Sequence, residues 1–137
     1  MIRAEAIRIP FRYAAGATSS AFLASLRDEQ ILVGSRCAAC ARVQCPPTSF
    51  CATCHGELGV GSLQPVGPSG DLVSWTRAPG RGAFGLVRLD GAHTALLHKL
   101  LGSEDDWRIG DRVRACFASE RSGHICDLLG FEKETSI

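Results

Sequence analysis

The order of hydrophobic and polar residues divides the chain into an N-terminal arm, a cysteine-rich middle and a strand-rich remainder. In the arm, every second residue from Ile7 to Tyr13 is apolar, with basic residues or proline between them. Such alternation is typical of an extended segment with one apolar face, and Pro10 argues against a central strand of a sheet. We therefore predict an extended arm that lies either on the protein's own surface or on a partner.

A short amphipathic helix is predicted after the arm. Residues 18–20 offer hydroxyl side chains for its N-cap, apolar residues follow at helical spacing from Phe22 to Leu26, and the run ends at Arg27. A helix of two to three turns is marginal in water, so its apolar face must pack against another part of the assembly. A short strand at 31–33 is expected to lead into the first cysteine.

Beyond residue 62 the pattern changes to short strands separated by turn residues such as Asp90-Gly91. A single helical turn is expected at 104–107. Five or six strands at this spacing indicate a small barrel, and a helical turn between the third and fourth main strands favours an OB-fold-like barrel. Strand count alone leaves an SH3-like barrel or a small sandwich open. The predicted strands are 63–66, 72–76, 84–89, 94–101, 112–118 and 124–131.

Two Cys-x-x-Cys pairs lie close together in the middle of the chain: Cys37, Cys40, Cys51 and Cys54. Two residues between cysteines allow a tight turn to aim both sulfurs at one point, and the segment between the pairs folds back to deliver the second. Four thiolates then close a tetrahedron with Zn–S bonds of about 2.3 Å. We therefore predict one structural Zn²⁺ in a rubredoxin-like zinc ribbon. The glycine usual after the second cysteine of each turn is absent, since Ala41 follows Cys40 and Gly56 comes two residues after Cys54.

The alternatives to zinc are ordinary buried thiols, a redox-active pair and disulfides. A redox Cys-x-x-Cys stands alone at the start of a helix in a βαβ unit, whereas this motif is doubled and lies among prolines. Seven cysteines are an odd number and the chain starts without a signal peptide, so we expect a cytoplasmic protein. Cys45 and His55 belong to no Cys-x-x-Cys pair and are left out of the ligand set. Cys116 and Cys126 are expected to be small core residues.

Composition limits the remaining possibilities. The 137 residues are 45% hydrophobic and 21% charged, which fits one globular domain or a small domain with an appendage. No apolar stretch approaches the ~20 residues of a membrane helix. The 15 basic and 14 acidic residues give a net charge of +1, which argues against binding nucleic acid through a general positive field. The expected fold class is mainly β, divided into an arm and helix (1–34), a zinc ribbon (35–62) and a barrel (63–137).

No catalytic set is recognisable in the sequence. The four histidines are dispersed, and neither a Ser-His-Asp order nor a Gly-x-Ser-x-Gly elbow is present. His98 is expected at a surface or edge position of its strand, and Asp105-Asp106 is expected to be a charge pair at a helix start. A zinc held by four cysteines has no open position for water, so it is structural. We therefore expect a chain without catalytic residues of its own.

The order of motifs resembles that of a known family. A short helical arm precedes Arg36-Cys37-x-x-Cys40 and Cys45-Pro46-Pro47-x-x-x-Cys51-x-x-Cys54. Next come Gly70-x-x-x-Ser74-Trp75-Thr76, Val87-x-Leu89-Asp90-Gly91 and Ile109-Gly110-x-x-Val113. This order resembles the zinc-ribbon, OB-fold proteins that accompany thiolase-like enzymes, the domain of unknown function 35 family, over residues ~17–118. The last strand departs from that family, because it reads Ile125 to Phe131 without a Phe-x-Pro motif.

The resemblance implies a function in lipid metabolism. Members of the family resemble small non-catalytic subunits of hetero-oligomers with a thiolase, a 3-ketoacyl-CoA synthase-like enzyme or a lipid-transfer-protein-type aldolase, and they share acyl-CoA with that partner. CoA needs cations for its phosphates and an apolar path for its chain. We expect these contacts at five residues, with solvated arginines and a barrel-core tryptophan as the alternative: Arg36, Arg42, Trp75, Arg77 and Arg81.

Two other functions remain as alternatives. Zinc ribbons and OB barrels also serve as nucleic-acid-binding modules, but that function calls for exposed aromatics flanked by lysines, and Lys99 and Lys133 are the chain's lysines. A thiol oxidoreductase would turn over disulfides and bind no metal, whereas the zinc hypothesis requires one stoichiometric ion.

Overall fold

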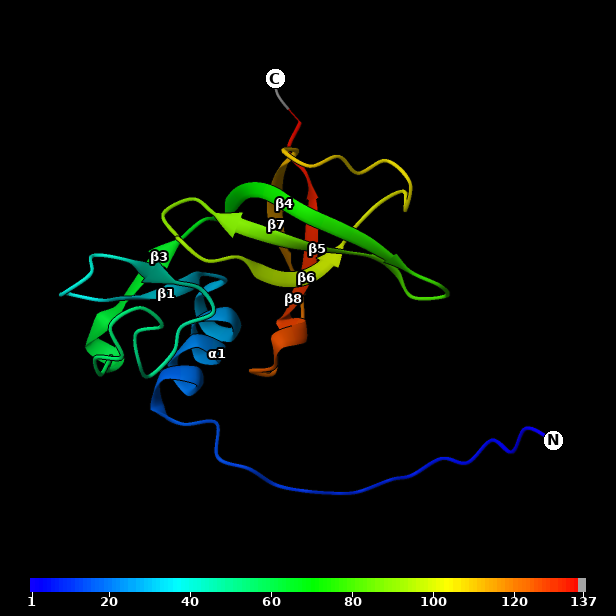
Figure 1. Cartoon of the computed structure of the whole chain (residues 1–137), viewed down its shortest axis with the longest axis horizontal. Helices are drawn as coiled ribbons and strands as arrows, with labels where there is room; N and C mark the ends of the chain where they lie inside the picture. The colour runs from blue at the N-terminus through cyan, green and yellow to red at the C-terminus, as the bar shows by residue number, and fades with distance from the viewer. Residues whose placement is uncertain (136–137) are drawn as a thin grey trace.

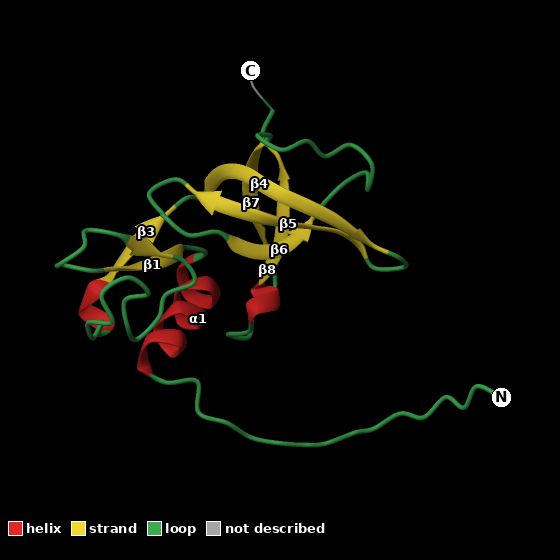
Figure 2. Cartoon of the chain, viewed as in Figure 1, coloured by secondary structure: helices red, strands yellow, loops and turns green. Residues whose placement is uncertain are grey.

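The computed structural model describes residues 1–135 of the 137-residue chain. An N-terminal arm leads into one helix, a three-stranded sheet and a closed barrel (Figures 1 and 2). The elements in chain order are α1 (Ala17–Glu29), β1 (Leu32–Arg36), β2 (Val43–Gln44), η1 (Val60–Ser62), β3 (Leu63–Val66), β4 (Ser69–Ala78), β5 (Gly82–Leu89), β6 (Leu96–Leu100), β7 (Arg112–Phe117), η2 (Ile125–Asp127) and β8 (Leu128–Lys133). The predicted mainly β fold with one short N-terminal helix is confirmed.

The N-terminal arm, residues 1–16, contains neither helix nor strand and extends away from the start of α1 (Figure 1). Its four alternating apolar side chains, from Ile7 to Tyr13, are 72% to 84% exposed. The arm therefore makes no use of its apolar face within the chain. Among residues 1–135, no helix has both the length and the hydrophobicity required to span a bilayer.

Helix α1 begins one turn earlier than its hydroxyl residues suggested. Gly16 occupies the N-cap with φ of 81° and provides no side-chain cap, so the predicted N-cap cluster at 18–20 lies inside the first turn instead. The buried face consists of Thr18, Phe22 and Leu26, and Leu26 is fully buried. This face packs against β1 and η2, which supplies the tertiary contact that so short a helix needs.

The three-stranded sheet has the order β2-β1-β3, with both neighbours antiparallel to β1. Strand β3 was expected as the first strand of the barrel, but it pairs with β1 from Leu32↔Val66 to Ser35↔Leu63. Gly34 in β1 permits this close packing, because a Cβ there would lie 2.7 Å from the Val43 side chain and 2.9 Å from the Gln44 carbonyl oxygen. The sheet therefore ties the residues before and after the cysteine motifs together.

The barrel closes through five strands in the order β4-β5-β6-β8-β7. All neighbours are antiparallel except β6 and β8, which join in parallel at the single pair Leu100↔Phe131. Two local predictions were wrong. Residues 104–107 form a turn without helix, and the segment expected as a strand at 124–131 begins with the 3-10 turn η2. Asp127 explains the second difference, because its carboxylate accepts hydrogen bonds from the amides of residues 122–124 and folds the chain back on itself.

One hydrophobic core runs through the helix, the ribbon sheet and the barrel. It joins Leu26 of α1, Val33 and Val43 of the sheet, and Val87 and Phe131 of the barrel. The loop between β5 and β6 also holds the backbone of β2 through hydrogen bonds. The Val43 amide donates to His93 Nδ1 at 3.0 Å. Next to it, Thr94 Oγ1 accepts from the Cys45 amide at 2.9 Å and donates to the Cys45 carbonyl at 3.0 Å. The ribbon and the barrel thus fold as one packed unit.

Candidate zinc centre and surface sites

Four cysteine sulfurs come together beside the ribbon sheet. The sulfur atoms of Cys37, Cys40, Cys51 and Cys54 all lie within 4.8 Å of one another, and those of Cys37 and Cys54 are 3.6 Å apart. A tetrahedron with Zn–S bonds of 2.3 Å has edges of about 3.8 Å, so the sulfurs are spaced for one zinc ion. The four predicted ligands are therefore brought together, with Cys37 and Cys51 buried and Cys54 exposed.

Each Cys-x-x-Cys pair sits on the same kind of tight turn. The Ala41 amide donates to the Cys37 carbonyl at 2.8 Å, and the His55 amide donates to the Cys51 carbonyl at 2.9 Å. Ala41 and His55 adopt the left-handed backbone conformation, with φ of 57° and 61°. These are the positions where such turns usually have glycine, and a residue with a Cβ costs about 1–2 kcal/mol there. The turn geometry is thus formed without glycine, at the expense of some backbone strain.

Backbone amides lie close to two of the four sulfurs. The Cys40 amide lies 3.4 Å from Cys37 Sγ, and the Thr53 amide lies 3.4 Å from Cys51 Sγ. Hydrogen bonds from the Cys54 and Thr53 amides lower the pKa of Cys51 to about 6, whereas hydrogen bonding to the Cys54 side chain and burial raise the pKa of Cys40 to about 12. Four sulfurs this close cannot all be thiolates without a cation between them.

The four cysteines therefore form a structural zinc site, one per chain. The donor set is soft and complete, and the two loops that supply it are held in place by the sheet formed by β1, β2 and β3. Buried Leu58 packs against Cys37 and Cys51 in a small second cluster beneath the site. Because all four positions are taken by protein ligands, the ion would order the two loops and leave no place for a reacting water.

The other cysteines are placed apart from the metal ligands. Cys45 is 1% exposed at the junction of ribbon and barrel, where burial raises the pKa of its thiol to about 12. Cys116 is half-buried on β7, and Cys126 is exposed in η2. The prediction that Cys126 is a core residue was therefore wrong, because η2 turns its side chain outward. His55 shapes the second turn through its backbone.

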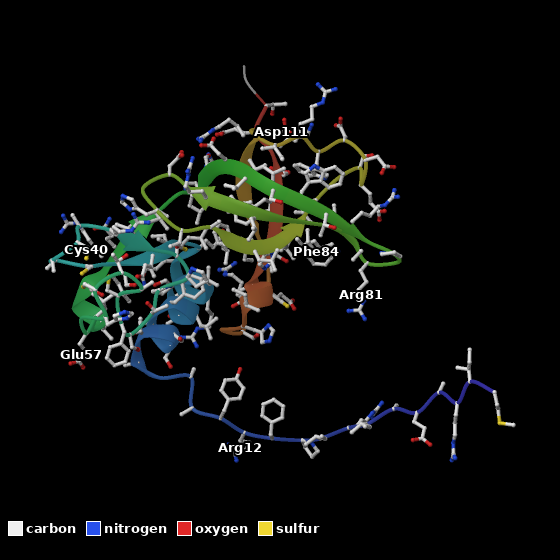
Figure 3. All side chains as sticks on the ribbon, viewed as in Figure 1. Arg12, Cys40, Glu57, Arg81, Phe84 and Asp111 are labelled. Carbon is white, nitrogen blue, oxygen red and sulfur yellow. The ribbon has the colours of Figure 1, made fainter. Side chains whose placement is uncertain are left out.

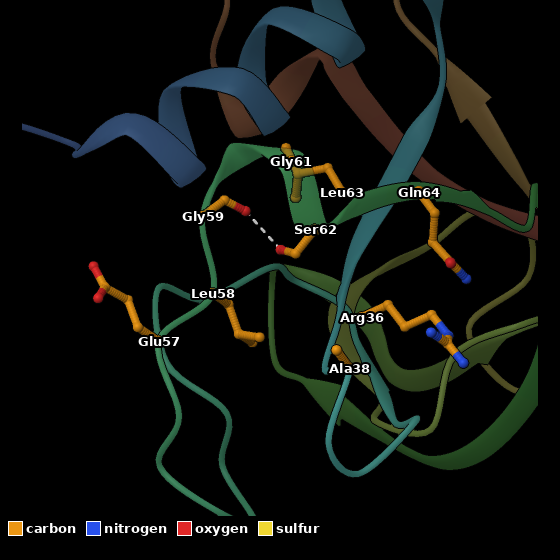
Figure 4. A pocket seen from close by; sticks show the side chains of 9 residues that line it. All are labelled: Arg36, Ala38, Glu57, Leu58, Gly59, Gly61, Ser62, Leu63 and Gln64. Atoms are coloured by element: carbon orange, nitrogen blue, oxygen red, sulfur yellow. Dashed lines mark hydrogen bonds between the residues drawn. The ribbon is translucent and has the colours of Figure 1, made fainter.

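The two ribbon arginines that were predicted to contact CoA lie on the outer side of the sheet. Arg36 lines a hollow of about 360 Å³ with Leu58, Leu63 and Gln64. Figure 4 shows Arg36 and Gln64 on one side of this hollow and Glu57 on the other. Arg42 is exposed on the loop after the first cysteine pair. The hollow is shallow and mixed in polarity, so it provides a cation without an apolar path.

The three hairpin residues predicted for CoA form a second group on β4 and the loop to β5. Trp75 is half-buried and packs against the barrel core, and Arg77 forms an ion pair with Asp105 at 2.7 Å. Arg81 lies exposed at the tip of the hairpin, on the opposite side of the folded body from Cys40 (Figure 3). The structure therefore separates the five candidate residues into two distant groups. Asp105 and Asp106 do not start a helix, and they pair with Arg77 and Lys133 instead.

His98 was expected at a surface or edge position, but it faces the interior. Its imidazole is half-buried, meets the edge of the Phe131 ring at 6.3 Å between centroids, and leaves Nδ1 buried without a hydrogen-bond partner. Its neighbour Leu97 is instead 62% exposed. Leu96 and Leu97 are both apolar, so the alternation did not reveal which of them points inward. Side chains two residues apart on a strand share a face, so an inward-facing Leu100 would have identified His98 as inward-facing too.

Comparisons with known proteins agree with this structure. A model of the ChsH2 rubredoxin-like zinc ribbon domain matches residues 24–59. A solved structure described as an Ltp2-ChsH2(DUF35) aldolase covers 89% of this chain and 98% of that chain, with a TM-score of 0.64 and 22% identity.

A second solved structure, a DUF35 family protein of unknown function from Sulfolobus solfataricus, covers 87% of this chain and 87% of that chain, with a TM-score of 0.65 and 18% identity. Comparison with curated proteins gave no match. The expected resemblance is confirmed: the chain is a zinc-ribbon protein with the fold of the DUF35 structures.

Proposed function

We propose that this chain is a non-catalytic accessory subunit that binds a thiolase-like enzyme acting on CoA thioesters, such as a thiolase or a lipid-transfer-protein-type aldolase. The similar solved structure is described as an aldolase made of Ltp2 and ChsH2(DUF35), which supports a role beside an enzyme subunit. The closed zinc site supports a structural task for the metal. In this proposal the reaction on the thioester belongs to the partner.

The exposed arm is the observation that carries the proposal. Four apolar side chains spaced on one face remain 72% to 84% exposed. A soluble protein seldom leaves so regular an apolar face in water unless another chain covers it. Arg8 and Arg12 alternate with these residues, so the matching groove on the partner has an apolar floor and acidic edges.

The ribbon extends this contact surface next to the root of the arm. Phe50 is 61% exposed and follows Ser49, whose hydroxyl lies 3.4 Å from the Thr18 hydroxyl in the first turn of α1. The start of α1 and the adjoining ribbon loop are therefore neighbours, and we propose that the partner contacts them together with the arm. We place the subunit interface there.

The finer assignments belong to the same proposal. Of the expected divisions 1–34, 35–62 and 63–137, we move the boundary between ribbon and barrel to residue 66, because β3 belongs to the ribbon sheet. We keep the OB-fold-like description of the barrel, a cytoplasmic location and a role in lipid metabolism. Contact with acyl-CoA is proposed for the hairpin group of Trp75, Arg77 and Arg81 in preference to Arg36 and Arg42. A track of apolar side chains adjoins the hairpin, whereas the ribbon hollow lacks one.

Size-exclusion chromatography with light scattering tests the proposal. The zinc-loaded chain is mixed with the thiolase-like protein encoded by an adjacent gene, and a hetero-oligomer is expected. Replacing both Ile9 and Phe11 by Ser should weaken the complex by about tenfold or more, because two buried apolar side chains are lost. The matched control replaces Ala4 and Ala6 by Ser in the same arm and should bind normally. A chain that elutes as a monomer at every concentration, alone and in the mixture, would contradict the proposal.

A further inference from the structure

Gln44 is a buried polar residue beside the zinc centre that is not itself a metal ligand. It lies on β2, directly opposite Ser35 of β1, and is 5% exposed. A buried amide group is normally satisfied by hydrogen bonds, so its partners indicate what it holds in place. The three partners of Gln44 all lie within residues 48–52, the segment that contains the zinc ligand Cys51.

The two ends of the Gln44 amide hold the backbone on both sides of Cys51. Its Nε2 donates to the Phe50 carbonyl at 3.3 Å, and its Oε1 accepts from the Ala52 amide at 2.5 Å. Nε2 also donates to Thr48 Oγ1, which in turn donates to the Phe50 carbonyl at 2.6 Å. One side chain thus fixes the peptide groups immediately before and after a metal ligand.

These contacts require the amide of a glutamine. A backbone N–H can only donate and a carbonyl can only accept, so a single orientation of the amide satisfies both residues that flank Cys51. A glutamate here would place an acceptor against the Phe50 carbonyl, and a methionine would leave both peptide groups without their partner. The position therefore needs the donor and the acceptor that glutamine carries on one planar group.

The backbone that carries Gln44 is itself held by the barrel. On one side of Gln44, the Val43 amide donates to His93 Nδ1, and on the other side the Cys45 amide and carbonyl both bond to Thr94 Oγ1. Because both flanking residues are fixed, the side chain has a rigid base from which to hold the turn of the second cysteine pair.

We propose that Gln44 is a positioning residue for zinc, which places Cys51 toward the other three ligands. It acts through the backbone of residues 50 and 52 and does not contact the metal. Its hydrogen bonds reach the second cysteine turn, whereas the first turn is closed by the backbone bond from the Ala41 amide to the Cys37 carbonyl. The proposal concerns the zinc centre and does not depend on the enzyme partner.

Metal competition on the full chain gives the first test. Gln44→Met keeps the length of the side chain and removes both hydrogen-bonding groups, so the dissociation constant for Zn²⁺ should rise by about 10–100-fold, as is typical when a partner of a metal ligand is lost. Gln64→Met, at a half-buried position of β3 in the same sheet, is the matched control and should leave the constant unchanged. An unchanged constant in Gln44→Met would overturn the proposal.

Hydrogen exchange of the zinc-loaded proteins separates positioning from a general loss of stability, which would also weaken zinc binding. The His55 and Ala41 amides close the two turns in the same way, so they form a matched pair of probes. Gln44→Met should speed the exchange of the His55 amide by about tenfold or more and leave the Ala41 amide unchanged. Val87→Ala, in the core of the barrel, should speed both amides by the same factor. Equal acceleration of both amides in Gln44→Met would show a general stabilising role and contradict the proposal.

The unmodified chain offers a measurement that needs no variant to fold. Both side-chain N–H groups of Gln44 donate within a buried site, so they should exchange slowly with zinc bound and rapidly after chelation under reducing conditions. Rapid exchange of these protons in the zinc-loaded chain would show that the Gln44 amide does not hold the Cys51 turn, and the proposal would fail.

Discussion

Two hydrogen bonds between the Thr94 side chain and the Cys45 backbone join the barrel to the ribbon, and they give the most direct test of how this structure is stabilised. Thr94 Oγ1 accepts a hydrogen bond from the Cys45 amide at 2.9 Å and donates one to the Cys45 carbonyl at 3.0 Å. Cys45 is 1% exposed, so water cannot replace either bond. Thr94→Val keeps the shape of the side chain and removes both bonds, which isolates the hydrogen-bonding contribution.

The expected cost follows from the two groups that lose their partner. A buried N–H or C=O left unpaired costs about 1–3 kcal/mol. The two groups together therefore cost about 2–6 kcal/mol. The methyl group that replaces the hydroxyl returns about 1 kcal/mol by hydrophobic burial, so we expect a net loss of about 1–5 kcal/mol in the free energy of unfolding. That is a large share of the ~5–15 kcal/mol by which a domain of this size is stable.

Urea unfolding of the zinc-loaded protein, followed by tryptophan fluorescence, measures this loss. The midpoint should fall while the m-value stays constant, because the surface exposed on unfolding is unchanged. Thr76→Val, at an exposed position of β4, makes the same chemical change and should alter the free energy of unfolding by less than about 0.5 kcal/mol. If Thr94→Val lowers the free energy of unfolding by no more than Thr76→Val does, the two hydrogen bonds between Thr94 and Cys45 are refuted as a source of stability.

Three further predictions concern the ribbon and the η2 turn. Elemental analysis should find one zinc per chain; a chelator under reducing conditions should unfold the ribbon, and Cys51→Ser should weaken zinc binding strongly. Ala41→Gly should raise the midpoint of urea unfolding by relieving the left-handed backbone, a gain of about 0.5–1 kcal/mol that Ala38→Gly should not reproduce. Burial opposes the charge on Asp127, but the amides of residues 122–124 outweigh it and lower its pKa. This stabilisation is present above the ordinary carboxyl pKa and is lost as pH falls below about 4, so acid-induced unfolding should depend less steeply on pH in Asp127→Asn.

The metal site was predictable from sequence because its information is local. Two residues between cysteines fix a turn, and the sulfurs need only one common point, so spacing alone identified Cys37, Cys40, Cys51 and Cys54. Alternation likewise located most barrel strands to within a few residues, since each strand has one face in the core.

The features that sequence did not reveal depend on contacts between distant residues. The pattern at 63–66 indicates a strand but not its partner, and only the fold shows that it pairs with β1. The apolar dipeptide Ile125-Cys126 looks like a strand, yet the backbone hydrogen bonds to Asp127 turn it into η2. The inward position of His98 escaped detection because the two successive leucines before it, Leu96 and Leu97, do not show which face of β6 is buried.

The core shared by ribbon and barrel makes zinc affinity a property of the whole chain. The two loops that carry the four zinc ligands are held by β1, β2 and β3, which share their core with the barrel. By thermodynamic linkage, any substitution that loosens the barrel side of this core also raises the dissociation constant of the metal, although it lies far from sulfur. Competition with a calibrated chelator therefore becomes a sensitive gauge of barrel packing, and weak metal retention in a variant need not indicate damage to its cysteines.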